Sequence, residues 1–324
     1  MPNLLWNIVA FADLCNEPLG ALFNGSDSCS RRAVGEYVSQ AAQRYRHEPA
    51  ILFWELYNEN NALVDGWMNG SAVACAPGES TPSHRTDADN FDTAQMIATH
   101  AWLAEKIRAA DPGRLINAGS SMPRPSAQHW RETPRAEVRR HRIDSTPDNR
   151  CEFVRNLLDT NAPPALDFVS VHSGFGAGDD ARPFRPPPAN GNGDALSDCW
   201  LLELARSVAA KRGQPFYLGE FAVAPATAAS QRNASYAEAV LDWVLGLNQR
   251  LGAGGGVLAS MWVFEYVNQN SSFSVIPGRD AGFLCKLQEA NRILSVADKP
   301  EDNRPEPQSE AEDGRSIAVP AAGT

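Results

Sequence analysis

Short apolar runs alternate with amphipathic segments along most of the chain. The runs are rich in β-branched and aromatic residues and predict buried strands at 4–11, 50–56, 115–118, 167–172, 215–219 and 257–264. Apolar residues at three-to-four spacing predict helices at 31–46, 91–110, 151–158, 195–212, 233–251 and 282–294. Strands that alternate with helices in this way predict an α/β fold of parallel strands joined by crossover helices.

Long polar segments separate several of these elements. The loop at 61–89 is a candidate cleft wall, in which Trp67 is placed to stack on a ligand. The predicted surface loop at 119–149 contains no histidines at metal-ligand spacing, and the Gly- and Pro-rich segment 174–193 is a predicted lid-like loop. Residues 298–324 have the composition of a disordered acidic, proline-rich tail, so 1–297 is the predicted domain.

Composition and charge restrict the partners. The 324 residues are 43% apolar and carry a net charge of −10, with no apolar run long enough for a transmembrane helix. A nucleic-acid groove or an anionic membrane surface would require a basic patch, so neither partner is expected. A neutral substrate fits this charge, and the eight Trp and thirteen Phe include candidates for stacking on sugar rings. We expect a monomer with no cofactor and no metal.

The cysteines and glycosylation motifs suggest a secretory route. None of the six cysteines forms a C-x-x-C motif, and Cys15 and Cys29 flank one polar loop, which makes them the first candidate disulfide. Four acceptor sequons begin at asparagines 24, 69, 233 and 270. The N-terminal stretch MPNLLWNIVAF predicts a strand and not a signal peptide, because it lacks a basic start and a cleavage site.

Two glutamates stand out by their positions after buried strands. Glu59 follows Asn58 just beyond the strand predicted at 50–56, and Glu220 follows the strand in PFYLGEFAV. The carboxyl ends of parallel strands meet at one edge, so the two carboxylates are expected to converge there. Such a pair suits glycosidic bond cleavage. A similar pair at Asn16-Glu17 lies in a loop and ranks lower, since isolated Asn-Glu pairs are usually polar turns.

Four segments resemble those of the family 5 glycoside hydrolases, retaining barrel enzymes that include cellulases and endo-β-mannanases. The segments are HEPAILFWELYNEN, DFVSVH, FYLGEF and VLASMWVF. By this resemblance Glu59 is the acid/base and Glu220 the nucleophile, while Asn58, His172 and Trp262 bind the sugar. The resemblance implies a (β/α)8 TIM barrel in which strands three to eight are present and the first two β/α units lack a counterpart.

Two departures from the family pattern concern the nucleophile. The family has a Tyr where this chain has Gly174, and an Arg on its first strands has no counterpart here; Tyr217, Tyr266 and Tyr57 are candidate substitutes. The sequence predicts a secreted retaining hydrolase of a β-linked polysaccharide. It does not distinguish a mannan substrate from a glucan substrate, or endo-acting from exo-acting cleavage. The alternatives are a catalytically inactive, truncated or carbohydrate-binding barrel and an unrelated metal-dependent barrel enzyme.

Overall fold

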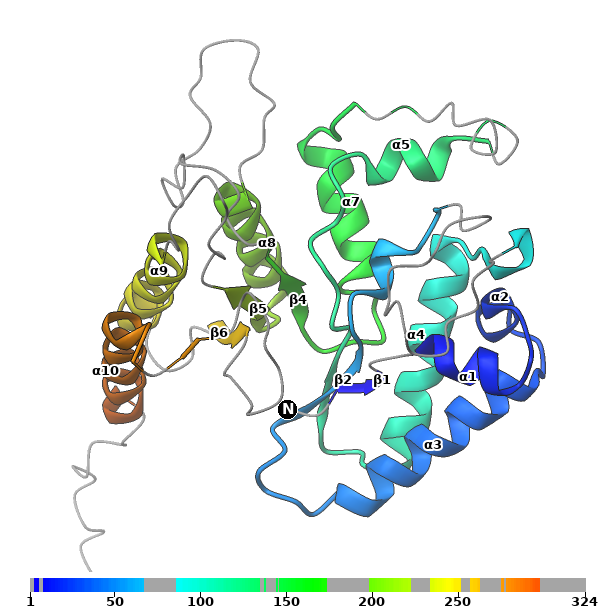
Figure 1. Cartoon of the computed structure of the whole chain (residues 1–324), viewed down its shortest axis with the longest axis horizontal. Helices are drawn as coiled ribbons and strands as arrows, with labels where there is room; N and C mark the ends of the chain where they lie inside the picture. Colours follow the sequence, from blue (N-terminus) through cyan, green and yellow to red (C-terminus); the bar gives the residue numbers. More distant parts are fainter. Residues whose placement is uncertain are drawn as a thin grey trace, which may run out of the picture.

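Parallel strands form the centre of the computed structural model (Figure 1), which describes residues 3–5, 8–66, 86–134, 137, 144, 146–173, 198–222, 234–251, 257–262, 275–276 and 278–297. The strands in these residues are β1 (Asn3–Leu5), β2 (Phe53–Tyr57), β3 (Leu115–Asn117), β4 (Val169–His172), β5 (Phe216–Ala222) and β6 (Val257–Trp262). They form two sheets of order β1-β2-β3 and β4-β5-β6, and every pairing is parallel. The predicted α/β class with parallel strands is confirmed.

A short extension of β3 joins the two sheets. The backbone N–H of His172 donates to the Ser120 carbonyl at 2.8 Å, and the Met122 N–H donates to the His172 carbonyl at 2.9 Å. These bonds surround a parallel bridge between Ser121 and His172. The strands therefore follow one another in chain order, and within the described residues β1 pairs only with β2 and β6 only with β5.

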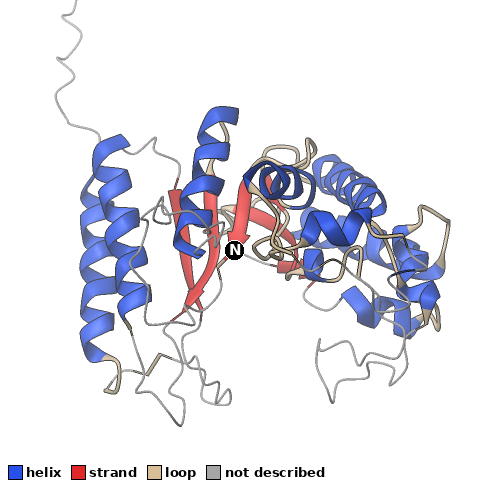
Figure 2. Cartoon of the chain, turned by 90° about the horizontal axis from the view of Figure 1, so that it is seen from above, coloured by secondary structure: helices blue, strands red, loops and turns tan. Residues whose placement is uncertain are grey.

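Helices flank the strands on both sides (Figure 2). They are α1 (Ile8–Leu14), α2 (Leu19–Phe23), α3 (Cys29–Tyr45), α4 (Thr93–Ala110), α5 (Ala127–Glu132), α7 (Arg150–Thr160), α8 (Asp198–Arg212), α9 (Ser235–Leu251) and α10 (Ala281–Ala297), with 3-10 turns η1 (Asn60–Ala62) and η2 (Asp87–Asp89). None of the described helices is both long and apolar enough to cross a bilayer.

Two large apolar clusters form the core, one for each half of the strand order. A small aromatic cluster of Phe53, Phe168 and Tyr217 lies between them. The ring centroid of Phe53 is 4.9 Å from that of Phe168 and 5.0 Å from that of Tyr217. Because β2 and β5 belong to different sheets, these rings pack the two halves together below the strand ends that carry the glutamates.

The predicted N-terminal strand is wrong over most of its length. The strand covers only Asn3–Leu5, and the helix Ile8–Leu14 follows it. Ile8, Val9 and Ala12 are the buried residues of this helix, at the three-to-four spacing of one helical face. A continuous apolar run does not separate a buried strand from a buried helix, and here packing against α3 selects the helix.

The loop that follows is tied to the start of α3. Ser28 caps this helix by accepting from the Arg31 N–H. The Glu17 carboxylate accepts from the backbone N–H groups of Cys29 and Ser30, each at 2.9 Å. Glu17 therefore anchors the helix start, which supports ranking Asn16-Glu17 below the later pair. The predicted disulfide between Cys15 and Cys29 is confirmed, with Cα atoms 5.8 Å apart.

The remaining predictions fall into two groups. The later strands and helices agree with their predicted ranges within a few residues, but the segment 119–149, predicted as surface loop, contains the helix α5. The loop at 174–193 and the tail at 298–324 lie outside the described residues.

Candidate active site

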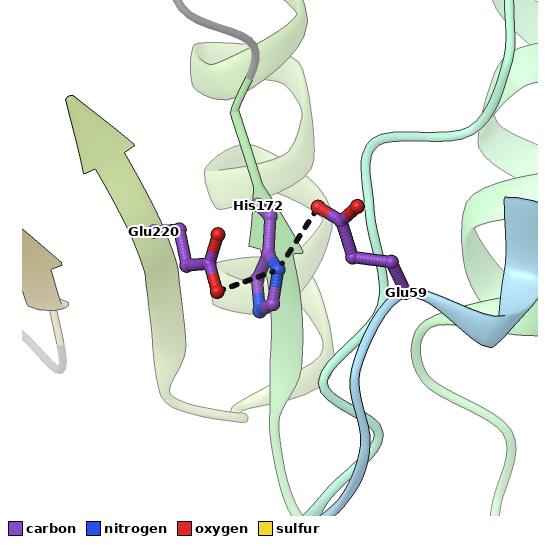
Figure 3. Close-up of side chains that lie close together, drawn as sticks. All are labelled: Glu59, His172 and Glu220. Carbon is purple, nitrogen blue, oxygen red and sulfur yellow. Dashed lines mark hydrogen bonds and ion pairs between the residues drawn. The ribbon is translucent and has the colours of Figure 1, made fainter. Parts of the chain in front are cut away.

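Three ionisable side chains meet at the carboxyl edge of the strands. Glu59 lies two residues beyond β2, His172 is the last residue of β4, and Glu220 lies near the end of β5, opposite His172 in the strand register. Because all strands run in the same direction, their carboxyl ends share one edge. Figure 3 shows the His172 ring between the two carboxylates.

The imidazole of His172 links the two glutamates. Its Nδ1 lies 3.1 Å from Oε1 of Glu59 and 3.6 Å from Oε1 of Glu220. One oxygen of each carboxylate and the ring nitrogen all lie within 4.8 Å of one another. The His172 side chain is 3% exposed, Glu220 14% and Glu59 38%, so Glu59 faces solvent most. The structure thus brings together the two acids that the sequence places on separate strands.

The backbone at Glu59 has an unusual conformation that a neighbouring glycine permits. Glu59 has a φ of 56°, in the left-handed region, and its N–H donates to the Gly119 carbonyl at 2.7 Å. Gly119 also has a positive φ, and a Cβ there would lie 1.9 Å from the Tyr57 carbonyl oxygen. Non-glycine residues in this region are uncommon and concentrate at functional sites. The turn directs the Glu59 side chain toward Ser121, whose hydroxyl donates to Oε1 at 3.2 Å.

The surroundings move the two carboxyl pKa values apart. Burial raises the pKa of Glu220 to about 7; the charge of His172 opposes this rise, whereas the charges of Glu59 and Glu55 add to it. Burial also acts to raise the pKa of Glu59, but the hydrogen bond and charge of His172 and the Ser121 hydroxyl outweigh it, so this pKa is lowered. Burial acts to lower the pKa of His172, but its bond to Glu59 and the nearby carboxylates raise it. Between the two values, Glu59 is ionised and Glu220 protonated.

We expect stability to fall as pH rises from 5 to 8. A carboxyl whose folded pKa of about 7 exceeds its ordinary 4.5 binds more protons in the folded state, so its contribution is lost as pH rises through this interval. Glu220 accounts for a loss of about 2 kcal/mol across the interval. The raised pKa of His172 acts in the same direction above 6.5. Urea unfolding at several pH values measures the loss, and Glu220→Gln should remove the Glu220 part; equal slopes in both proteins would contradict the raised pKa.

The tyrosines proposed as partners of Glu220 are placed elsewhere. The Tyr217 hydroxyl donates to the Gly219 carbonyl at 3.4 Å and lies 2.8 Å from the Ser260 hydroxyl. Tyr57 is buried in the core of the first half, with its ring 5.2 Å from that of His100. Tyr266 lies outside the described residues, within which no Arg or Lys forms an ion pair with Glu220.

The predicted sugar-binding residues differ in how well they are placed. Asn58 is half-buried beside Glu59, and its Oδ1 has no hydrogen-bond partner within the described part of the chain. Trp262 is the last residue of β6. It is paired in register with Ala222 of β5, and Ala222 lies two residues after Glu220 in the chain. Trp67 lies outside the described residues.

The same three side chains have donor atoms that a metal ion can use. A nitrogen from His172 and an oxygen from each glutamate are close enough to share one divalent cation. To bind it through Nδ1, His172 would have to give up the proton that it donates to Glu59. Metal binding by these three residues would therefore compete with the hydrogen bond between His172 and Glu59.

Comparison with known proteins identifies the relatives of this chain. No family model matches the sequence. The chain is 25% identical over 265 residues to a protein of Oryza sativa subsp. japonica that has the provisional name mannan endo-1,4-beta-mannosidase 5. The chain is therefore similar to a protein named as a mannan endo-1,4-beta-mannosidase. The alignment covers 78% of this chain and 44% of the rice protein, so the chain spans less than half the length of this relative.

One solved structure, of a family 5 glycoside hydrolase, has a similar fold. The family 5 mannosidase from Rhizomucor miehei matches with a TM-score of 0.50 at 11% identity, over 91% of this chain and 71% of that one. The endo-β-1,4-mannanase from Thermotoga petrophila matches with a TM-score of 0.48 at 14% identity, over 92% of this chain and 56% of that one. At this identity the Rhizomucor structure supports the fold alone.

Three residues of the site were not singled out from the sequence. Ser121 donates to Glu59, Gly119 makes room for the turn at Glu59, and Gly219 makes room for the His172 ring. The sequence contained a signal for Gly119 and Ser121, because both directly follow a predicted strand. They therefore lie at the carboxyl edge of the strands, where the glutamates are expected. Gly219 gave no such signal, since a glycine inside a strand predicts a bulge or close approach without naming the neighbour.

We expect Gly219→Ala to disturb the His172 ring. A Cβ at position 219 would lie 2.6 Å from both Cδ2 and Nε2 of the imidazole, which is 3% exposed and has no room to retreat. Overpacking of this kind costs about 1–3 kcal/mol and should separate Nδ1 from Glu59. Thermal unfolding measures the loss. Gly246→Ala in α9 is the matched control, because nothing lies within 4 Å of its added Cβ; equal stability in both variants would contradict the predicted contact.

Proposed function

We propose that this chain is the catalytic part of a secreted, retaining glycoside hydrolase that cleaves β-mannan. The observation that supports this most strongly is the separation of the two carboxylates, whose nearest oxygens lie within 4.8 Å. Retaining enzymes hold their carboxyl groups about 5–5.5 Å apart, whereas inverting enzymes need about 6.5–9.5 Å to admit a water molecule. The kinship with a mannosidase favours mannan over glucan.

In this proposal Glu59 and Glu220 have separate roles. Glu220, the more buried acid, attacks the anomeric carbon, while Glu59, the more exposed acid, protonates the leaving oxygen and then activates water. Asn58 offers a sugar hydroxyl an amide oxygen that has no hydrogen-bond partner among the described residues, and Trp262 at the end of β6 offers an aromatic face. His172 fixes the positions of the two carboxylates by contacting both.

The proposal extends to the architecture and the compartment. We assign β1 to the third strand of the family barrel and β6 to the eighth, because the segments that contain β2 and β6 resemble the family's fourth and eighth strands. Neither β1 nor β6 pairs on its outer side within the described residues. The Cys15–Cys29 disulfide favours an oxidising compartment, in agreement with secretion. One monomer acting on a polysaccharide is the expected unit.

The test is hydrolysis of β-mannan followed by NMR of the first products. The proposal predicts new reducing ends that appear as the β-anomer and only later equilibrate. Initial α-anomer would show inversion. Absence of any product from the folded chain would overturn the proposed activity.

One observation favours a second function, a catalytically inactive barrel that binds mannan. The nucleophile of a retaining enzyme must be ionised and its acid protonated, yet the pKa of Glu220 is raised to about 7 and that of Glu59 is lowered. No Arg or Lys within the described residues pairs with Glu220 to correct this order. Calorimetric binding of manno-oligosaccharides without turnover, unchanged by Glu59→Gln, would establish this function instead.

A further inference from the structure

A second cluster of metal-binding side chains lies away from the glutamate pair. The cluster consists of His129 on α5, Asp148 in the loop before α7, and Glu152 on α7. Each of these residues places one donor atom within 4.8 Å of the others. His129 Nδ1 is 3.9 Å from Oδ1 of Asp148, and its Nε2 is 3.8 Å from Oε2 of Glu152. Sequence spacing did not indicate this cluster, because two of the donors lie far from His129 in the chain.

One donor of the cluster is a buried carboxylate oxygen that accepts no hydrogen bond from the described residues. Asp148 is 1% exposed, and its Oδ2 accepts from the Gln128 N–H at 2.9 Å and from the Asn156 amide at 3.3 Å. These two bonds fix the plane of the carboxylate. Oδ1 then lies toward His129 and has no hydrogen-bond partner among the described residues. A buried carboxylate oxygen left in this state is costly unless a cation or a donor satisfies it.

The histidine is oriented as metal-binding histidines are. Its Nδ1 lies 2.7 Å from the Thr146 carbonyl, which can only accept, so Nδ1 carries the proton. The lone pair is then on Nε2, which lies on the side of Glu152. Metal-bound histidines almost always donate their other N–H to a carbonyl or carboxylate, which fixes the ring and its tautomer.

We propose that His129, Asp148 and Glu152 bind a divalent transition-metal ion of the zinc class. One imidazole and two carboxylates suit Zn²⁺, with water completing a four-coordinate site. The Glu152 side chain is 24% exposed, and its Oε2 accepts from the Asn149 N–H at 2.7 Å, while Oδ2 of Asp148 accepts from Gln128 and Asn156. The ion joins α5, the loop before α7 and the first turn of α7. The site is independent of the glutamate pair and of the proposed hydrolase activity.

The test is calorimetric titration of the chelator-treated full chain with Zn²⁺, paired with thermal unfolding. We expect one bound Zn²⁺ and a raised melting temperature in the wild type. Glu152→Gln should weaken binding at least about tenfold, and because Gln at this position retains the acceptor for the Asn149 N–H, folding should be unaffected. Asp148→Asn should do the same, while Asp27→Asn, on a side chain 85% exposed, is the matched control and should bind normally.

A parallel titration of Glu220→Gln separates this cluster from the active site. The proposal predicts full Zn²⁺ affinity in that variant. Loss of binding in Glu220→Gln with normal binding in Glu152→Gln would move the ion to the catalytic glutamates and overturn the proposal. Absence of Zn²⁺ binding by the wild type would also overturn it and leave His129 as an imidazolium paired with its acidic neighbours.

Discussion

Glu220→Gln is expected to abolish mannan hydrolysis and to reduce kcat/KM by at least about 10⁴-fold. Removing a residue that forms or activates the nucleophile has an effect of this size in other hydrolases. The physical reason is that the amide cannot form the covalent glycosyl-enzyme intermediate, and nothing else on β5 offers a carboxylate at this position. Initial rates on β-mannan, measured from new reducing ends, give the effect.

The control for this variant is Glu105→Gln, the same substitution on an exposed residue of α4. It should retain full activity. Because burial disfavours the charged form of Glu220, removing its charge should leave the fold intact or more stable at neutral pH. A folded Glu220→Gln protein that keeps activity within tenfold of the wild type would remove Glu220 from the proposed mechanism.

Glu59→Gln should reduce mannan hydrolysis by about 10²–10⁴-fold, the usual contribution of a general acid/base. The loss should depend on the leaving group. A dinitrophenyl mannoside needs no protonation to depart, so its first chemical step should be nearly unaffected and a burst of dinitrophenolate should precede slow turnover. Stopped-flow absorbance measures the burst.

The contrast between substrates separates this role from a structural one. Glu59 adopts a left-handed backbone and accepts bonds from His172 and Ser121, so a purely structural defect would lower both rates equally. An equal loss on mannan and on the dinitrophenyl substrate would contradict general acid catalysis. Ser121→Ala provides a milder comparison, since it removes one bond to Glu59 and leaves the carboxylate.

The protonation order of the pair is the main physical difficulty of the proposed chemistry. With the pKa of Glu220 at about 7 and that of Glu59 lowered, the form with ionised Glu220 and protonated Glu59 is a small minority at every pH. A cation beside Glu220 would lower its pKa and reverse the order. The resemblance to the family 5 glycoside hydrolases implies an Arg and a Tyr at this place, and Gly174 stands where that resemblance puts the Tyr.

The sequence predicted the parts of the site that follow from strand direction. Glu59 and Glu220 come from strands of two different sheets, yet the rule that parallel strands end at one edge was sufficient to bring them together. It could not predict that His172 would contact both acids, because this contact depends on the register of β4 against β5. The glycine at 219 that admits the ring is equally invisible before the neighbour is known.

The errors have similar physical causes. The apolar run after Leu5 is compatible with a buried helix and with a buried strand. The packing of Ile8, Val9 and Ala12 on one face favours the helix. The helix containing His129 is six residues long and too polar to show a periodic apolar face. Short elements of this kind are held by contacts with distant residues, which a local pattern does not contain.

The most direct test of the proposed mechanism is to trap the intermediate on the intact chain. Incubation with an activated 2-deoxy-2-fluoro mannoside should add the mass of one fluorosugar, and peptide mapping should place it on Glu220. A label on Glu59, or no label on a folded chain that still binds manno-oligosaccharides, would contradict the assignment of Glu220 as the nucleophile.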